Sequence, residues 1–582
     1  MPDRDIDLAL SVPMTGSLAQ LPRDIITHHL IPQFTSPAIL LQSHSAAPTA
    51  QATPSAAPLR SLASTSRHFR ALVAAEYRTY CQHQYPSLYA RSLEQALAVG
   101  ASVDSIDWCD KVTTAEKLSS RWANRQINFS IVAAGDRLGL SAEHSPRSSS
   151  RSAGSRATPY APCIDVHEGI DGVETLVIGK GTQLAVRVGK ADAHWRWDTR
   201  PGMAPSADDF VGVHIFDEDT VLASRSRGIE LVSGIKDAKT PLQPVSSDMF
   251  SSGVTNPTGG ITSSCLDMAS TAGTRHFAVT ATESANEHVL HVFSIHRDAV
   301  DDNRIQLSPE PLSSPIPSKS WTSTFLTATT IATGHRAGVS LHQLSQSSIS
   351  AVTTLPQPRT FYKHDLSVHS LMPLHPPTFS PALLATGWSD GAVRLVDTRV
   401  GDYVATYFNL IFEQTVPVYS LLHTGPLANM LLAGSSQHDA LCMYDLRSAG
   451  GPISPPTSAT TSTSTATLPR DADLDSCVIF LERFTRRTAG NQGRYNAPSS
   501  AIYSLAAPLD SSKVYAAAEG AVLELDFTHH PDGVARTAVD VPLWSREVTV
   551  PLYLFSLAKG RMSDRRCIFT PWQCGKGQKV PR

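Results

Sequence analysis

The 582-residue sequence lacks long hydrophobic runs. No stretch approaches the ~18 apolar residues that a membrane-spanning helix needs, so we expect no membrane contact. The first ten residues, MPDRDIDLAL, carry charges of both signs and lack the apolar stretch of a signal peptide. These two features predict a cytoplasmic and/or nuclear protein.

The sequence also lacks the cysteine and histidine spacings of metal sites. Its 8 cysteines lie far apart, form no CxxC and pair with no histidine at zinc spacing, which predicts reduced thiols. The 22 histidines are scattered, and the adjacent pairs His28-His29 and His529-His530 do not have the i, i+4 spacing of a helical metal site. We therefore expect neither a metal nor another cofactor.

Catalytic signatures are missing as well. There is no GxSxG or HExxH motif. The segment Gly179-Lys180-Gly181 is like a phosphate-binding loop, but it lacks the upstream glycine and the Ser/Thr that must follow the lysine. The sequence predicts a protein that is not an enzyme, and an enzyme acting through its own site is the least favoured alternative.

Charge is scarce and balanced. Only 17% of the residues are charged, against a usual ~25%. The 49 basic and 52 acidic residues give a net charge of −3, which disfavours a globally basic nucleic-acid binder. Basic residues collect at the C-terminus, where residues 561–582 are interpreted as a solvated tail in preference to a nucleic-acid contact.

Three segments have too little apolar surface to offset the entropy of ordering, and we expect each to be a mobile loop. They are the Ala/Pro/Ser-rich residues 43–58, the Ser/Arg-rich residues 141–158 and the Ser/Thr/Pro-rich residues 448–469. The last belongs to a longer range, 448–497, that we predict to be a disordered insertion outside the folded core.

The first ~125 residues favour helices. Apolar residues recur at helical spacing after Pro22, again through 59–73, and in 110–127, where Leu118 and Trp122 stand one turn apart. We predict a small helical domain over 1–75, with its insertion at 43–58, and a helical linker over 76–126.

From about residue 127 short β-rich runs repeat. The unit is a VxSL-like strand (VHSL 368–371, VYSL 418–421, IYSL 502–505), a small-residue strand ending near glycine, a tight turn and an alternating strand. Seven second strands recur at a spacing near 50 residues, and one such unit cannot bury both faces of its sheet. The fold class is therefore predicted to be mainly β: a seven-bladed propeller over 127–560, preceded by the small helical domain.

The segment LLATGWSDGAVRLVDTR (383–399) resembles a WD repeat. In that family a His, a strand Ser/Thr, a turn Asp and a Trp form a hydrogen-bonded chain across the blade. The resemblance places His364, Thr386 and Asp390 in the first three positions. Val396 replaces the Trp, which truncates the chain, and Tyr444-Asp445 takes the Trp-Asp position of the next blade.

The N-terminal segment resembles an F-box. LPRDIITHHL (21–30) matches the start of that motif, and LRSLASTSRHFRALV (59–73) matches its end, with Ser66, Arg67, Phe69 and Arg70 in register. Two departures are present: about 28 residues separate the halves, and Thr65 stands where Val is usual. The alternative interpretation is a helical cap on the propeller.

F-box proteins with WD repeats are substrate receptors of SCF ubiquitin ligases. The resemblance implies a non-catalytic subunit whose F-box binds a Skp-type adaptor, and through it a cullin, while the propeller holds a protein substrate. The alternative is a WD-repeat scaffold of another complex. The apolar residues that divide between the helical core and the adaptor contact would be Leu21, Pro22, Ile25, Ile26, Leu62, Phe69 and Leu72.

The turns between second and third strands share one rim of the propeller and are predicted to meet the substrate. The turn or adjoining positions include a basic set, with acidic Asp390 and Glu519 elsewhere on the rim. Guanidinium groups bind phosphate and carboxylate strongly, which favours an acidic or phosphorylated peptide. The basic residues are Lys180, Arg225, Arg227, His335 and Arg336.

Overall fold

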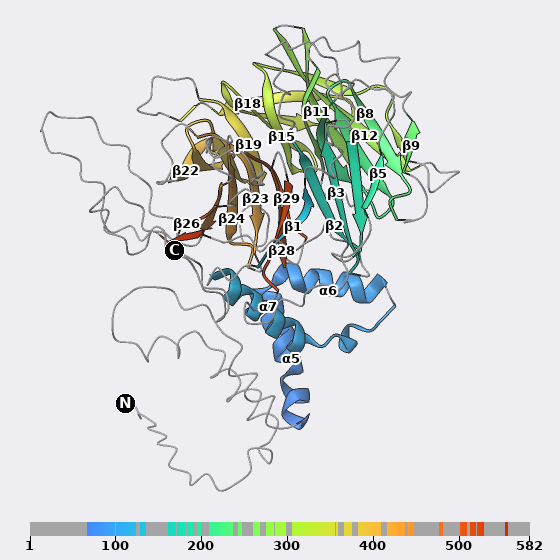
Figure 1. Cartoon of the computed structure of the whole chain (residues 1–582), viewed down its shortest axis with the longest axis vertical. Coiled ribbons are helices and arrows are strands. Elements are labelled where there is room, and N and C mark those ends of the chain that lie inside the picture. The colour runs from blue at the N-terminus through green and yellow to red at the C-terminus, as the bar shows by residue number, and fades with distance from the viewer. Residues whose placement is uncertain are drawn as a thin grey trace, which may run out of the picture. The chain divides into compact units, whose positions relative to one another are not determined.

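The computed structural model describes residues between Arg67 and Thr528, and again 553–556. The longest breaks between them are 135–160, 247–259, 447–475 and 481–500, with shorter breaks in other loops. The chain divides into two compact units, Met1–Ser120 and Arg121–Arg582. Helices make up the described part of the first unit and β-sheets dominate the second (Figure 1).

The first unit contains α5 (Arg67–Gln84), α6 (Pro86–Ala98), the short helix η3 (Val103–Ser105) and most of α7 (Trp108–Ala123). Apolar and aromatic side chains form its core, because each helix has one apolar face. Tyr77, Cys81 and Val112 are fully buried. Tyr89 stacks on Trp108 with ring centroids 5.0 Å apart. The helix predicted over 110–127 is present as α7 as far as Ala123, and 124–127 lie outside the described residues.

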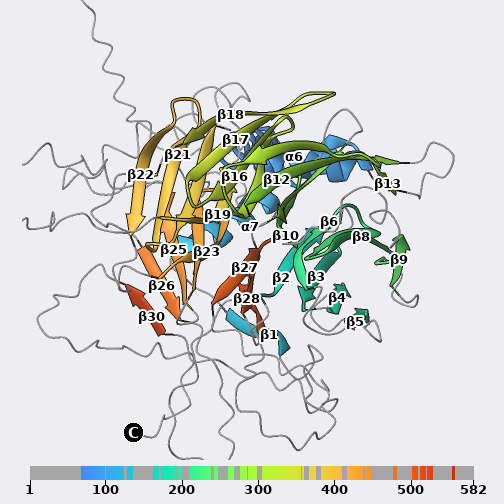
Figure 2. The ribbon, with the colours of Figure 1, turned by 90° about the horizontal axis from the view of Figure 1, so that it is seen from above.

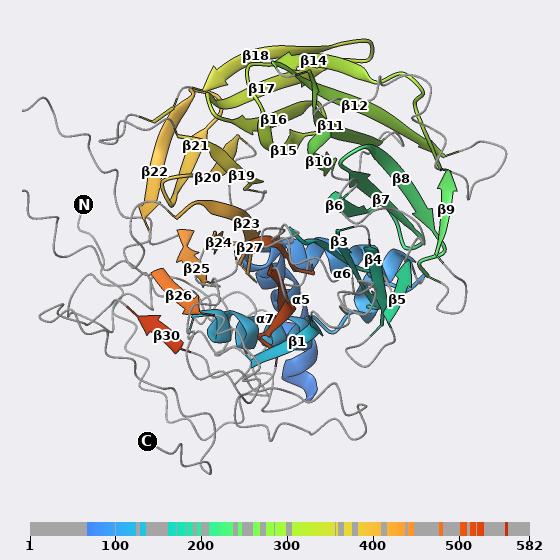
Figure 3. The same ribbon diagram turned by 45° about the horizontal axis from the view of Figure 1, so that its top comes forward.

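The second unit is a ring of seven antiparallel sheets, so the predicted seven-bladed β-propeller is confirmed (Figure 3). Each predicted second strand is present at its expected place. Within a blade the strands are called inner, second, third and outer, and the same sheets are seen from another direction in Figure 2.

The first three blades follow one another along the chain, each from inner to outer strand. Blade 1 consists of β2 (Cys163–Glu168), β3 (Glu174–Lys180), β4 (Gln183–Val188) and β5 (Trp195–Asp198). Blade 2 consists of β6 (Phe210–Ile215), β7 (Thr220–Arg225), β8 (Gly228–Ser233) and β9 (Gln243–Ser246). Blade 3 consists of β10 (Gly260–Leu266), β11 (Arg275–Ser284) and β12 (Glu287–Arg297), with β13 (Ile305–Leu307) and β14 (Leu312–Ile316) both paired to β12.

The next three blades keep this order. Blade 4 consists of β15 (Ser320–Thr327), β16 (Thr330–His335), β17 (Gly338–Leu344) and β18 (Ile349–Leu355). Blade 5 consists of β19 (Val368–Pro373), β20 (Leu383–Trp388), β21 (Ala392–Asp397) and β22 (Asp402–Phe408). Blade 6 consists of β23 (Val418–Thr424), β24 (Met430–Ser435), β25 (Ala440–Asp445), β26 (Ser476–Phe480) and β30 (Tyr553–Ser556).

Strand β26 corrects one sequence prediction. It lies inside the range 448–497 that we expected to be an insertion outside the core, yet it pairs along its length with β25. The sequence SCVIF is apolar and β-branched, which suits a strand, whereas the Ser/Thr/Pro-rich composition belongs to 448–469. The remainder of the predicted insertion, the predicted loop 141–158 and the basic tail lie outside the described residues.

Blade 7 closes the ring with strands from both ends of the unit. It consists of β27 (Ile502–Ala506), β28 (Lys513–Ala518), β29 (Ala521–Asp526) and, as its outer strand, β1 (Asn128–Ala134). Trp122, near the start of the second unit, lies against this blade, since its ring stacks on Phe527 with ring centroids 3.8 Å apart. Arg121 also donates a hydrogen bond from Nη1 to the Phe527 carbonyl oxygen at 3.0 Å. Closure of this kind leaves no open seam between first and last blade.

The core lies between neighbouring blades. Buried Ala385 and Val393 of blade 5 pack with Val418 and Leu431 of blade 6, and similar clusters lie between blades 1 and 2, 2 and 3, 3 and 4, 4 and 5, and 7 and 1. Small residues near the end of the second strand allow this approach. At Gly387 a Cβ atom would lie 2.7 Å from Cγ1 of Val418 in the next blade, so only glycine fits there.

Candidate protein-interaction surface

One rim of the propeller carries the turns between second and third strands, together with the ends of the inner strands where each blade begins. This rim is where sequence analysis placed the basic residues. In the strand register, these second strands continue one residue beyond their small residue, which is Gly179 in blade 1 and Gly334 in blade 4. Lys180 pairs with Gln183, and His335 pairs with Ser320.

That extra paired residue corrects the expected exposure of three basic side chains. Lys180, Arg225 and His335 are buried because each still belongs to its strand and faces the interior of the sheet packing. The turn itself begins one residue later. Their predicted role in substrate binding required solvent exposure, which these three side chains lack.

The partners of Arg225 and His335 explain the burial of these two side chains. The Arg225 Nε atom lies 3.0 Å from Oε1 of Glu230, and its guanidinium lies 4.0 Å above the Phe210 ring. The His335 Nδ1 atom accepts from the Ala337 amide, so Nε2 carries the proton that it donates to Ser340 Oγ at 2.8 Å. Burial and neighbouring His342 lower the pKa of His335 to about 4, which keeps it neutral.

The other two predicted residues are placed differently. Arg227 and Arg336 lie in the turns themselves and are exposed. The amide of Gln357 holds the backbone at Arg336, since Gln357 Nε2 donates to the carbonyl oxygens of Arg336 and Leu366. Substrate binding by Arg227 and Arg336 stays a prediction.

The polar chain expected in blade 5 is present in altered form. Thr386 Oγ1 accepts from Trp388 Nε1 at 2.8 Å and donates to the Arg394 carbonyl oxygen at 2.9 Å. The indole in this chain is therefore that of Trp388 in the second strand, whereas the resemblance placed the Trp position at Val396 in the third strand. The Asp390 carboxylate pairs with the Arg394 guanidinium, and His364 lies outside the described residues.

The second position of the VxSL motif has a role that the sequence pattern did not indicate. In six of the seven blades the pairing of inner and second strands skips one residue at this place, which is a β-bulge. A bulge re-aims one side chain while its neighbours keep their places. The bulged residues are Val211, Thr262, Trp321, His369, Tyr419 and Tyr503.

In four consecutive blades, 4 to 7, the bulged residue is aromatic, and these four rings form a continuous series that we call the aromatic arc (Trp321, His369, Tyr419, Tyr503). Neighbouring ring centroids are 5.7, 5.3 and 5.8 Å apart in that order. Trp321 is 43% exposed. Because the arc follows β15, β19, β23 and β27, it runs along the inner side of the ring (Figure 3).

The third position of the motif holds the arc in place. Ser370 donates to the carbonyl oxygen of Val418 at 3.0 Å, and Ser420 donates to that of Ile502 at 2.9 Å. Each bond joins an inner strand to the inner strand of the next blade. The aromatic residues just before these serines are therefore set on a backbone that is tied across blades.

Two cations stand at the blade 4 end of the aromatic arc. Lys319 is exposed, and its Nζ atom lies 4.3 Å from the centroid of the Trp321 ring. Arg336 follows His335, which pairs with Ser320, so it lies in the same blade at the same rim. Among the described rim residues of blades 4 to 7, the one acid is Asp390, which is buried against Arg394. The blade 3 turn that precedes blade 4 carries two acids, Glu283, which pairs with His291, and exposed Glu287.

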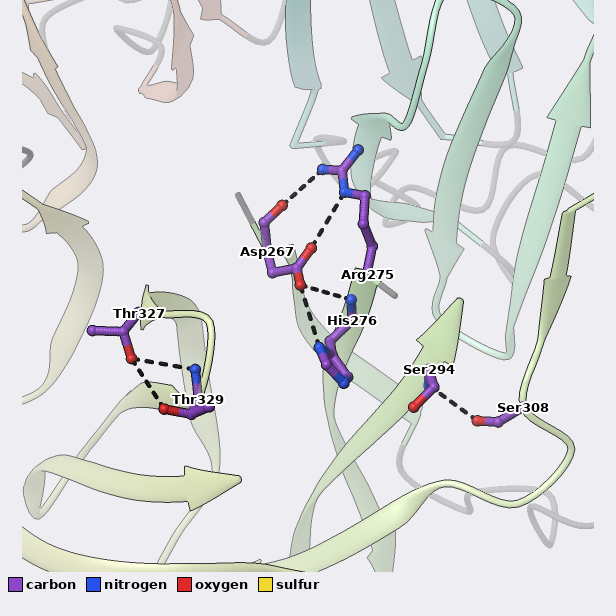
Figure 4. A network of polar contacts seen from close by, with 7 residues as sticks. All are labelled: Asp267, Arg275, His276, Ser294, Ser308, Thr327 and Thr329. Atoms are coloured by element: carbon purple, nitrogen blue, oxygen red, sulfur yellow. Dashed lines mark hydrogen bonds and ion pairs between the residues drawn. The ribbon is translucent and has the colours of Figure 1, made fainter. Parts of the chain in front are cut away.

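A cluster of polar groups around Asp267, on the opposite rim, joins neighbouring strands and blades by hydrogen bonds. The buried Asp267 carboxylate accepts from Arg275 Nε at 3.3 Å and from the His276 amide at 2.8 Å (Figure 4). Arg275 also donates to the Phe216 carbonyl oxygen of blade 2. Within the described ranges, no group of three or more His, Cys, Asp or Glu residues is placed to hold a metal ion. No helix there is both long and apolar enough to cross a membrane.

Most residues of the predicted adaptor contact lie outside the part of the chain that the structure describes. Leu21, Pro22, Ile25, Ile26 and Leu62 lie outside the described residues, and Phe69 and Leu72 lie in the first half of α5.

Comparison with known proteins found no matching protein-family model and no matching curated protein. A crystal structure of Sqt1 from Chaetomium thermophilum, bound to the N-terminus of the ribosomal protein L10, is similar at 14% identity and a TM-score of 0.38. The match covers 60% of this chain and 80% of that chain.

Proposed function

We propose that the chain is a non-catalytic protein-interaction subunit whose propeller binds a partner protein at the rim carrying the aromatic arc. The observation that carries this proposal is the arc itself: four aromatic side chains are turned out of the strand pairing by bulges at one repeated position. Aromatic residues supply much of the binding energy at protein interfaces.

The more specific form of the proposal is a substrate receptor of an SCF-type ubiquitin ligase. It rests on the sequence motif alone, namely Leu21-Pro22 and the Ser66–Arg70 segment ahead of a propeller. In this form the segment 1–75 binds a Skp-type adaptor, which links to the cullin, and the propeller presents the substrate. A cytoplasmic and/or nuclear location accompanies it.

Co-purification tests the ligase assignment. The tagged full chain is expected to bring down the Skp-type adaptor and the cullin, and a variant with Ile25→Glu and Ile26→Glu is expected to lose both. A matched surface pair, Lys117→Glu and Asp110→Lys on α7, serves as the control and should keep them. Absence of adaptor and cullin from a clean preparation of the unmodified chain would favour a scaffold of another complex instead.

A further inference from the structure

We propose that the aromatic arc, together with Lys319 and Arg336, binds an extended acidic peptide segment of the partner protein. This inference rests on the proposed interaction function and names the chemistry of the partner. It deepens that function by assigning the contact to six residues of blades 4 to 7, four of which come from a repeated motif position.

The geometry of the arc suits an extended chain. Its rings follow one another at 5.3 to 5.8 Å. About five residues of extended peptide, at ~3.3 Å each, span such a series. Inter-blade bonds such as that from Ser370 to Val418 tie the backbone that carries the rings, and the rings pack on one another, so little side-chain entropy is lost when a peptide covers them.

Charge selects the kind of peptide. Among the described rim residues of the arc's own four blades, the exposed charges at this end are Lys319 and Arg336, because the buried pair with Arg394 neutralises Asp390; Glu287 of the blade 3 turn lies outside the arc. A carboxylate on the bound segment gains attraction from both cations, whereas a basic segment is repelled by them. Lys319 already lies over the Trp321 ring, so a bound carboxylate and that ring would contact the same ammonium group.

Single-stranded nucleic acid also combines aromatic and cationic contacts, but the ring geometry disfavours it. Bases stack on free ring faces. Here the Tyr419 and Tyr503 rings stack on each other at 17°, and His369 packs edge-on against Tyr419. The rings thus occupy one another's faces and present a continuous surface to a ligand, in keeping with a peptide.

The experiment uses the purified full chain and an array of individually synthesised nonapeptides. One set carries Asp and Glu among Leu, Phe, Pro and Gly, a second carries Lys and Arg in place of the acids, and a third is uncharged. A labelled oligouridylate is the nucleic-acid probe. The Kd of the strongest acidic peptide is then measured by fluorescence polarisation.

We expect the acidic set to be bound preferentially. Trp321→Ala should weaken the strongest acidic peptide at least about tenfold, and Trp321→Phe should restore part of the loss, because truncation of an aromatic anchor removes its contact area. Lys319→Glu with Arg336→Glu should weaken the same peptide by a similar factor and admit basic peptides. Val352→Ser is the matched control, since this exposed residue of β18 lies on an outer strand.

Several results overturn the inference. They are preference for the basic or uncharged set, absence of binding to any acidic peptide, tighter binding of oligouridylate, and equal losses for Trp321→Ala and Val352→Ser. Near-ultraviolet circular dichroism confirms that each variant is folded, which is expected because Trp321 is partly exposed. Co-purification of the Skp-type adaptor is scored separately, so its outcome and that of the peptide array are distinguishable.

Discussion

Asp390 and Arg394 form a buried ion pair with two parallel hydrogen bonds, Nη1 to Oδ1 at 3.0 Å and Nη2 to Oδ2 at 2.6 Å. The carboxylate also accepts from the Ala392 amide and so holds the turn between β20 and β21. The resemblance placed the Asp390 carboxylate in a WD-type hydrogen-bonded chain. In the structure its hydrogen-bond donors, Ala392 and Arg394, both lie in the third strand of its own blade.

Loss of one member of this pair should destabilise the propeller. Arg394→Met leaves the Asp390 carboxylate buried without its partner, and we expect the free energy of unfolding in urea to fall by about 3–5 kcal/mol. Arg399→Met is the control, because Arg399 pairs with Asp397 but is 67% exposed, and its loss should change the free energy of unfolding far less. Equal effects would show that Asp390 does not depend on Arg394.

The close approach of blades 5 and 6 predicts the effect of one added methyl group. Gly387→Ala places a Cβ atom against Ser370 Oγ and against Val418 Cγ1, both of which lie on packed inner strands. We expect a loss of about 1–3 kcal/mol in thermal or urea unfolding. Gly228→Ala meets no atom within 4 Å and should be nearly neutral, so a matching loss there would contradict the packing argument.

Blade 4 should be sensitive to mild acid. Burial lowers the pKa values of His335 and His342 to about 4, below the usual 6.5. The unfolded chain therefore binds more protons between pH 6.5 and 4, and stability falls as pH falls through this window. From pH 7.5 to 5 we expect about 1–2 kcal/mol of loss per histidine.

Urea unfolding at the two pH values measures this loss. His342→Asn should reduce the difference between them, whereas His83→Gln, at an exposed position on α5, should leave it unchanged. A difference that His342→Asn does not reduce would place the acid sensitivity elsewhere.

Ring closure should depend on the hydroxyl of Tyr515. Its oxygen lies 2.6 Å from Glu174 Oε1 of blade 1 and 2.9 Å from Glu524 Oε2 of blade 7. Arg187 Nη2 donates to the same oxygen at 3.1 Å, so charges of both signs meet at this junction. Since one hydroxyl proton cannot serve both carboxylates at once, two cations balance them: Arg187 pairs with Glu174 at 2.8 Å, and Lys513 Nζ lies 3.5 Å from Glu524 Oε2.

Tyr515→Phe removes the oxygen that these three charged groups share. We expect a loss of about 1–3 kcal/mol in unfolding free energy, because buried polar groups lose a partner. Limited proteolysis should also detect earlier release of β1, whose pairing with β29 completes the same blade. Tyr503→Phe, in the neighbouring inner strand, is the control and should leave both measurements near their original values.

Much of the fold was predictable because strand patterns are local. The small-residue second strands, such as LLATG and MLLAG, recur at a regular spacing, and each is followed by a tight turn. A unit of that kind must stack on its neighbours to bury its faces, which determines the propeller. Leu118 and Trp122, one helical turn apart, likewise marked α7, and both are buried.

The sequence alone determined the blades and their order, while only the tertiary structure decided which side chains reach the rim. Lys180, one residue after Gly179, and Arg336, two residues after Gly334, were both expected at the turn, yet strand pairing buries Lys180 and the turn exposes Arg336. The bulge that aims Tyr419 toward His369 is likewise set by pairing with a partner strand and by contact with the next blade. Such pairings join residues far apart in the chain, and a one-residue difference in register moves a side chain to the other face of its sheet.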